Sequence, residues 1–128
     1  MQEGRKRLSK AQRMMVYQKY DGHCAYCGKK IEYKDMQVDH IESVYTSYLR
    51  GRRVDNSLEN LMPACRACNY YKRTSTIEDF RSDIQNLRKQ LERSFDYRMA
   101  KRYGLVEEHP ENVKFYFEQH DPTDPTLI

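Results

Sequence analysis

In CRACNYYK, residues 65–72, an asparagine directly follows two cysteines in C-x-x-C spacing. A second C-x-x-C pair lies in HCAYCGKKI, residues 23–31, and the two pairs account for every cysteine in the chain. Two such pairs can supply four thiolates to one tetrahedral zinc ion. We therefore expect a structural zinc site whose ligands are Cys24, Cys27, Cys65 and Cys68.

The alternatives for the four cysteines are a redox pair or free thiols. A redox pair is disfavoured because there are two pairs and because no thioredoxin-like βαβ pattern surrounds either of them. A zinc ion bound by four cysteines has no open coordination position. The predicted metal would therefore stabilise the fold and would not take part in chemistry.

Length and composition predict one small domain, residues 1–128, with a modest core. Charged residues make up 33% of the chain and the mean hydropathy is -1.02. Burial then gives limited stability, which a bound metal would increase. The sequence has no apolar run of membrane-spanning length and no signal-peptide pattern at its start, so we expect a cytoplasmic protein in a reducing compartment.

The positive charge is concentrated around the cysteines. Residues 1–30 carry eight Lys/Arg and two acids, residues 65–102 carry ten and five, and residues 103–128 carry one and six. A cluster of positive charge favours binding to a polyanion, because association releases counterions from phosphates. The alternative is an ordinary solvated surface.

Hydrophobic spacing predicts the first half of the chain as follows. A helix over residues 9–20 begins with a capping box of Ser9 and Gln12. A hairpin follows over residues 31–41, with His40 at the end of its second strand. Residues 42–59 have no sustained period and are predicted to be a long loop, whose arginines either bind DNA or are simply solvated.

The second half is predicted to begin with a short helix that carries Cys68 to about Lys72. One long helix is expected over residues 76–103, with a capping box of Ser75 and Glu78 and a stop at Gly104. The alternation in NVKFYFEQH, residues 112–120, predicts a strand, and residues 121–128 are predicted to be a frayed tail.

Candidate site residues lie between and just after the cysteine pairs. Asp39 precedes His40 in QVDHIES, and Asn60 and Asn69 follow along the chain. Taken singly, an Asp-His pair more often lies on the solvated surface, and an asparagine near a turn more often caps a helix. Their grouping around one predicted zinc core favours a functional site.

The order C-x-x-C, Asp-His, Asn-Leu, C-x-x-C-N-x-x-K over about residues 17–75 resembles the HNH nuclease family, also called ββα-metal or His-Me finger endonucleases. The resemblance implies an α+β fold: a small ββα-metal, treble-clef-like core held by zinc. We expect it to be joined by the N-terminal helix, the long C-terminal helix and the C-terminal strand. The motif core would be about residues 17–75, with an extension over residues 76–120.

The same resemblance implies an endonuclease that hydrolyses DNA phosphodiester bonds. His40 would be the general base, and Asp39 and Asn69 would bind one Mg²⁺ or Mn²⁺. Asn69 stands where the family name implies a histidine. Asn60 would brace the loop and orient the His40 backbone or ring, and Lys72 would contact a phosphate. Adjacent residues of a strand point to opposite faces, so Asp39 and His40 would need a bend or bulge to serve one site.

The partners implied by the resemblance are DNA and, as in some small phage and bacterial members, DNA-packaging proteins. No membrane partner is expected, and a homodimer would help an enzyme with one site per chain to cut both strands. Two other classes of function are considered. One is a zinc-held nucleic-acid-binding module without catalysis, which would need no Asp-His pair; the other is a protein-interaction adaptor that uses the long helix.

Overall fold

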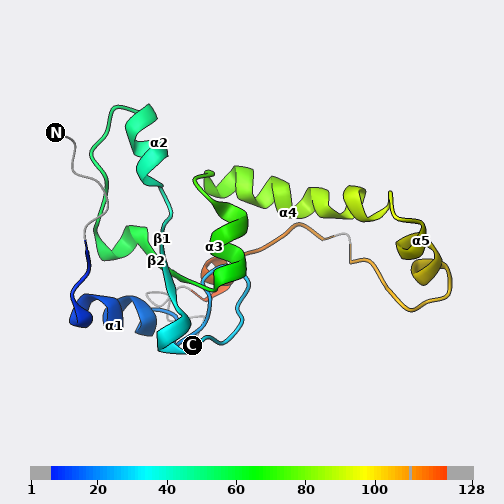
Figure 1. Cartoon of the computed structure of the whole chain (residues 1–128), viewed down its shortest axis with the longest axis horizontal. Helices are drawn as coiled ribbons and strands as arrows, with labels where there is room; N and C mark the ends of the chain where they lie inside the picture. The colour runs from blue at the N-terminus through cyan, green and yellow to red at the C-terminus, as the bar shows by residue number, and fades with distance from the viewer. Residues whose placement is uncertain (1–6, 110, 121–128) are drawn as a thin grey trace.

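The computed structural model describes residues 7–109 and 111–120, so the predicted frayed tail lies outside the described residues. The fold is a mixture of helices and one small antiparallel sheet (Figure 1). Its elements in chain order are α1 (Lys10–Gln18), the 3₁₀ turn η1 (Tyr33–Asp35), β1 (Gln37–His40), α2 (Val44–Leu49), the 3₁₀ turn η2 (Leu58–Asn60), β2 (Leu61–Ala64), α3 (Arg66–Lys72), α4 (Ile77–Leu91), α5 (Phe95–Arg102) and α6 (Tyr116–Gln119).

The sheet consists of β1 paired antiparallel with β2, in the register Gln37↔Ala64 to His40↔Leu61. The segment of the first cysteine pair attaches to this sheet, since the Ala25 N–H donates to the Pro63 carbonyl at 2.8 Å. β2 leads within one residue into α3, which carries the second cysteine pair. Two strands, a helix and a four-cysteine cluster are compatible with the expected small α+β ββα-metal core.

A cluster of aromatic rings forms the centre of the core. The Phe80 ring of α4 stacks on Phe115 at 5.0 Å between centroids, and the Tyr26 ring meets both edge-on at 5.4 and 5.7 Å. Phe80 and Phe115 are almost fully buried. These three rings join the first cysteine segment, α4 and the C-terminal segment into one core.

The N-terminal helix is confirmed. Ser9 and Gln12 form both hydrogen bonds of the expected capping box at the start of α1. The hairpin expected over residues 31–41 is wrong, because β1 pairs with the distant β2 and residues 33–35 form a 3₁₀ turn. Arg13 of α1 donates to the Tyr33 and Met36 carbonyls, which keeps this turn against α1.

The loop expected over residues 42–59 is interrupted by helix α2. Ser43 caps this helix by accepting a hydrogen bond from the Thr46 N–H, at 3.0 Å. Ser43 and Thr46 also donate to the Thr74 carbonyl beyond α3. The helix therefore depends on a long-range contact, and its weak apolar period in the sequence did not indicate it.

The single long helix expected over residues 76–103 is wrong, because the chain breaks between α4 and α5. Ser94 accepts a hydrogen bond from the Tyr97 N–H and starts α5, so the break is a capped junction. The start also differs: Thr76 caps α4 through the Asp79 N–H, in place of the predicted box of Ser75 and Glu78. The stop at Gly104 is confirmed, with a φ of 75° that favours glycine.

The C-terminal strand expected in residues 112–120 is also wrong, because α6 forms there. The Tyr116 and Phe117 N–H groups donate to the Tyr26 and Ala25 carbonyls, which gives this segment only a short attachment. Glu118 accepts from the Phe115 N–H at 2.8 Å and closes a helical turn. A local turn therefore replaces the alternating strand.

The helices α4 and α5 form an arm that extends away from the sheet (Figure 1). The chain then returns to the core, where Phe115 is buried against Phe80. Arg81 anchors the returning segment by donating to the Val113 carbonyl and pairing with Glu118. The Glu118 pKa is lowered because the Arg81 guanidinium donates to its carboxylate. None of the helices in the described part of the chain has the length and apolar character needed to cross a membrane.

Replacing Phe115 by alanine should lower the free energy of unfolding by about 3 to 5 kcal/mol, because a fully buried phenyl ring would leave a cavity. Phe95→Ala is the matched control, since that ring is 66% exposed, and it should change stability by about 0.5 kcal/mol or less. Urea unfolding of the zinc-loaded proteins measures both. Equal effects of the two substitutions would contradict the docking of the C-terminal segment.

Candidate functional site

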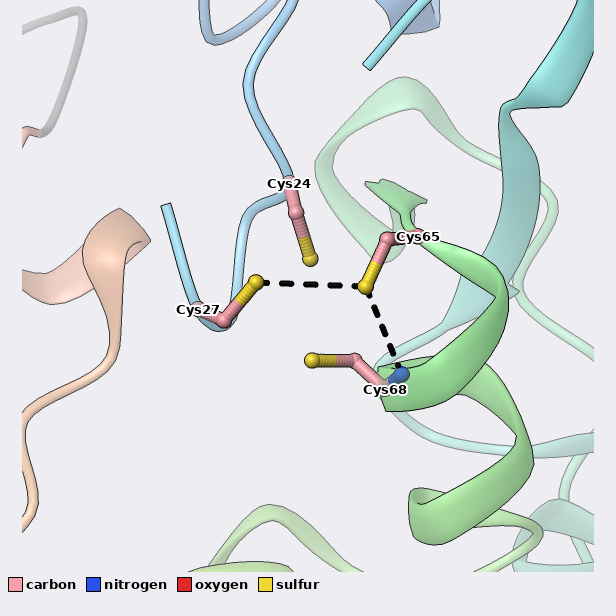
Figure 2. Close-up of side chains that lie close together, drawn as sticks. All are labelled: Cys24, Cys27, Cys65 and Cys68. Carbon is pink, nitrogen blue, oxygen red and sulfur yellow. Dashed lines mark hydrogen bonds between the residues drawn. The ribbon is translucent and has the colours of Figure 1, made fainter. Parts of the chain in front are cut away.

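The four cysteine side chains converge on one point, as Figure 2 shows. Their sulfur atoms all lie within 4.8 Å of one another, and Cys27 Sγ is 3.8 Å from Cys65 Sγ. A tetrahedral zinc ion with Zn–S bonds of about 2.3 Å requires sulfur atoms about 3.8 Å apart. The geometry and the chemistry of the donors therefore both fit zinc.

In each cysteine pair, a backbone N–H group donates a hydrogen bond to a cysteine sulfur. In the first pair, the Lys29 N–H donates to Cys27 Sγ at 3.4 Å, and Gly28 takes a φ of 79° to make the turn. In the second pair, Cys65 is the N-cap of α3, and its sulfur accepts from the Cys68 N–H at 3.4 Å. Hydrogen bonds from backbone N–H groups stabilise thiolates, which are the form that binds zinc.

The thiols influence each other's protonation. The Cys68 thiol and nearby backbone groups donate hydrogen bonds that lower the pKa of Cys24 to about 5. The pKa of Cys68 is raised, because its proton is held in the hydrogen bond to Cys24 and its thiol is partly buried. Hydrogen bonds within the cluster therefore favour the thiolate form of Cys24.

His23, next to Cys24, lies outside this cluster. Its ring stacks on Tyr116 at 5.2 Å between centroids, and its Nδ1 lies 3.1 Å from the Tyr20 carbonyl. The four sulfurs are the only donor group of this kind among residues 7–109 and 111–120. The expected four-cysteine set is thus brought together, and the histidine has a packing role.

Asp39 lies at the centre of a buried polar cluster. The Lys72 Nζ of α3 lies 2.9 Å from Asp39 Oδ2, and both side chains are almost completely buried. The Tyr26 hydroxyl donates to the same carboxylate oxygen. Burial and the negative charge of Asp39 raise the pKa of Tyr26 well above its ordinary value, so the hydroxyl remains a donor. One carboxylate oxygen therefore receives two donors.

Both donors come from the two cysteine segments. Tyr26 lies between Cys24 and Cys27, and Lys72 lies on the helix that begins after Cys65. The four-cysteine cluster thus positions both partners of Asp39. Lys72 also donates to the His40 carbonyl at 3.1 Å, which ties the end of β1 to α3.

The structure places Lys72 differently from the phosphate contact expected from the sequence. Its side chain is 0% exposed and its ammonium faces Asp39, so solvent does not reach it. Asn69, one turn earlier on α3, is partly exposed. Because residues three apart lie on one side of a helix, Asn69 and Lys72 share one side of α3.

Asp39 and Asn69 offer oxygen donors, which are the ligands that Mg²⁺ prefers. The donor type therefore fits the expected magnesium. The Asp39 carboxylate, however, already holds the Lys72 ammonium, so a divalent cation at this oxygen would have to replace Lys72. The chain supplies its own cation at the position expected for the metal.

The His40 ring is held by a residue that the sequence did not indicate. His40 Nε2 lies 2.9 Å from Asn56 Oδ1. An amide oxygen only accepts, so Nε2 is the donor in this contact. Nδ1 is buried and has no hydrogen-bond partner among the described residues. Asn56 therefore orients the ring, and Nδ1 is the nitrogen left without a partner.

No periodic signal marked Asn56, because it lies in an irregular segment 16 residues after His40. The only sequence cue is its place in Asp55-Asn56, a pair typical of turns. Asp55 accepts from the Ser57 N–H at 2.9 Å, which forms such a turn and presents Asn56. The contact itself depends on how the loop folds back on β1.

Asn60 joins the two ends of the loop between β1 and β2. Its Oδ1 accepts from the Glu42 N–H at 2.9 Å, and its Nδ2 donates to the Glu42 and Asp55 carbonyls. Asn60 is buried, so these bonds satisfy an amide that would otherwise be costly to bury. The backbone around His40 is closed by Asn60, and the ring is held by Asn56.

Asp39 and His40 leave β1 on opposite faces. The four pairs from Gln37↔Ala64 to His40↔Leu61 are consecutive, so the described strand contains no bulge. Asp39 faces Tyr26 and Lys72, and the His40 ring faces Asn56. The two side chains are linked through Lys72, which contacts the Asp39 carboxylate and the His40 carbonyl.

The family model of HNH endonucleases matches residues 24–75 of the chain. That span contains both cysteine pairs, β1, β2 and α3, and with them Asp39, His40, Asn60 and Asn69. No curated protein matches the chain. The resemblance found in the sequence is confirmed for this span, and it supports a nuclease-type function.

Replacing Cys68 by serine should reduce bound zinc well below one ion per chain and lower the helical signal in circular dichroism, because metal binding and folding are coupled. His23→Ala is the control and should keep its zinc, since His23 lies outside the cluster. Elemental analysis gives the zinc content. A Cys68→Ser protein with full zinc, or a His23→Ala protein without it, would contradict the four-cysteine site.

Lys72→Met should cost about 3 to 5 kcal/mol of unfolding free energy, because it leaves a buried carboxylate without its cation. The double variant Asp39→Asn, Lys72→Met should cost clearly less than the sum of the two single changes. Urea unfolding tests this cycle, with the exposed Lys89→Met as control. Strict additivity would show that the ion pair contributes nothing.

Proposed function

We propose that the protein is a divalent-metal-dependent endonuclease that hydrolyses DNA phosphodiester bonds, with His40 as general base. The observation that carries this proposal is the His40 ring, whose Nε2 is held by Asn56 and whose Nδ1 has no partner in the described chain. The ring lies within the span that matches HNH endonucleases.

Hydrolysis of a phosphodiester requires a deprotonated water, neutralisation of the charge on the phosphate, and alignment. For His40 Nδ1 to take the proton of the attacking water, the water has to gain access to an atom that is buried in this structure. Asn56 keeps the opposite nitrogen protonated, so the lone pair stays at Nδ1. Asn56 therefore acts as a positioning residue for the base, and Asn60 keeps the surrounding loop closed.

The proposed cofactors are one structural Zn²⁺ at the four cysteines and one Mg²⁺ or Mn²⁺ at Asp39 and Asn69. The divalent ion supplies stabilisation of the negative charge that develops on the phosphate. Asp39 and Asn69 would hold the ion, and Asp39 would then have to exchange its ion pair with Lys72 for the metal. Lys72, on the same helix as Asn69, would then be the cation available to a phosphate.

A zinc-held nucleic-acid-binding module without catalysis is the second candidate. The Asp39–Lys72 pair favours it, because Asp39 is already neutralised and faces away from the His40 ring. The two candidates differ in one property. A nuclease requires the His40 imidazole, and a binding module does not.

His40→Ala should reduce the rate of plasmid nicking in Mg²⁺ by about 100-fold or more, because general bases contribute about 10² to 10⁴ in rate. Added imidazole should restore part of the activity by replacing the missing base. Agarose gels of supercoiled, nicked and linear plasmid give the rates. Zinc content is measured in parallel, to show that the fold is intact.

His109→Ala is the matched control, because His109 is exposed and lies outside the family-matched span. Asn56→Ala should lower the turnover number more than it changes KM, and Asn56→Asp, which keeps an acceptor oxygen, should retain more activity. Unchanged nicking by His40→Ala would overturn the assignment of the base. Absence of nicking by the wild type in Mg²⁺ and in Mn²⁺ would favour the binding module.

A further inference from the structure

A groove of about 410 Å³ runs beside the outer face of β1, between α1 and the turn η1. Its polar lining consists of Arg7, Arg13, Lys34, Gln37 and His40, and the rest of the lining is apolar. Arg7 and Arg13 precede residues 24–75, so they lie outside the span that matches the HNH family. The N-terminal segment of the chain therefore supplies Arg7 and Arg13 to the lining of the groove.

The charge of the groove has one sign. Among the residues that the structure describes, three cationic side chains line it and no carboxylate does. A second and larger hollow beside the cysteines differs, because Glu32 and Asp35 line it together with its lysines. The arginines of the loop after β1 differ as well, since Arg50 and Arg52 are both paired with Glu42. An excess of positive charge in a concave surface attracts phosphates.

Arg13 is held in place by the protein itself. Its Nη2 donates to the Tyr33 carbonyl at 3.3 Å and to the Met36 carbonyl at 2.6 Å, and its guanidinium lies 5.2 Å from the Tyr33 ring centroid. No carboxylate forms an ion pair with Arg13 in the described chain. Its charge is thus fixed at the groove without being neutralised.

Lys34 is available for a new partner. Its ammonium lies 3.7 Å from Glu32, and the two side chains are 77% and 76% exposed. Exposed pairs of this kind contribute little and are readily exchanged for another anion. Arg7, on the other side of the groove, is exposed.

The groove reaches the proposed general base. His40 lines it, although the side chain is only 2% exposed, and the Nδ1 of the same ring is the buried atom that lacks a partner. Cationic side chains and the base thus share one wall. We propose that this groove binds the phosphate backbone of the DNA strand that is cut, through Arg7, Arg13 and Lys34, and leads it to His40.

This inference rests on the proposed nuclease function, so its test measures binding without cleavage. The full-length, zinc-loaded protein is titrated into a fluorescently labelled DNA duplex of about 20 base pairs in buffer without Mg²⁺, and anisotropy gives the affinity at several salt concentrations. Lys34→Glu and Arg7→Glu each should weaken binding by on the order of tenfold. Loss of one phosphate contact should also reduce the slope of log K against log[salt] by about 0.9.

Lys89→Glu is the matched control, because it makes the same change of charge on an exposed position of α4, away from the groove. It should change the affinity less than threefold. Equal effects of Lys34→Glu and Lys89→Glu, or no binding by the wild type at low salt, would overturn the proposal that this groove binds DNA. A wild type that binds in this way but never cleaves would support the groove and overturn the nuclease.

Discussion

The convergence of four sulfurs is the constraint on which the rest of the structure depends. It joins a turn near the start of the chain to the first turn of α3, which lies about forty residues later. Tyr26 sits inside the first cysteine pair and Lys72 ends the helix that begins after Cys65, and both bind Asp39. A metal at the sulfurs therefore sets the geometry of the buried carboxylate without touching it. A chain with modest apolar content gains from this arrangement, since one cluster fixes the core and the site together.

The buried Asp39–Lys72 pair is the second constraint. A buried charge is costly unless it is paired and hydrogen-bonded, and here one carboxylate receives an ammonium and a hydroxyl. Lys72 also binds the His40 carbonyl, so the same side chain joins α3 to the strand that carries the base. The divalent ion proposed for Asp39 would have to compete with Lys72 for the carboxylate. Under that proposal, the affinity for the ion would depend on α3, which carries Lys72.

The side chains on the two faces of β1 make different contacts. The inner face presents Asp39 to the buried cluster, and the outer face presents His40 to the loop and to the cationic groove. Asn56 and Asn60 come from the same irregular loop, and each meets the end of β1 through side-chain hydrogen bonds. The loop therefore contributes groups that position His40, the proposed base, and the N-terminal segment contributes positive charge. Within the extension, the Phe80 and Phe115 rings attach the arm to this core.

The sequence alone determined the features that depend on local spacing. The two C-x-x-C pairs predicted the sulfur cluster, the capping box of Ser9 and Gln12 predicted α1, and the motif order predicted the family match. Long-range contacts decided the rest. β1 paired with β2 rather than with residues 31–36, and the alternating residues 112–120 became a helical turn, because distant carbonyls and side chains offered better partners than local ones. The tertiary structure alone showed that Lys72 is turned inward to Asp39 and that Asn56 holds His40, since hydrogen bonds between residues far apart in the chain leave no period in a sequence.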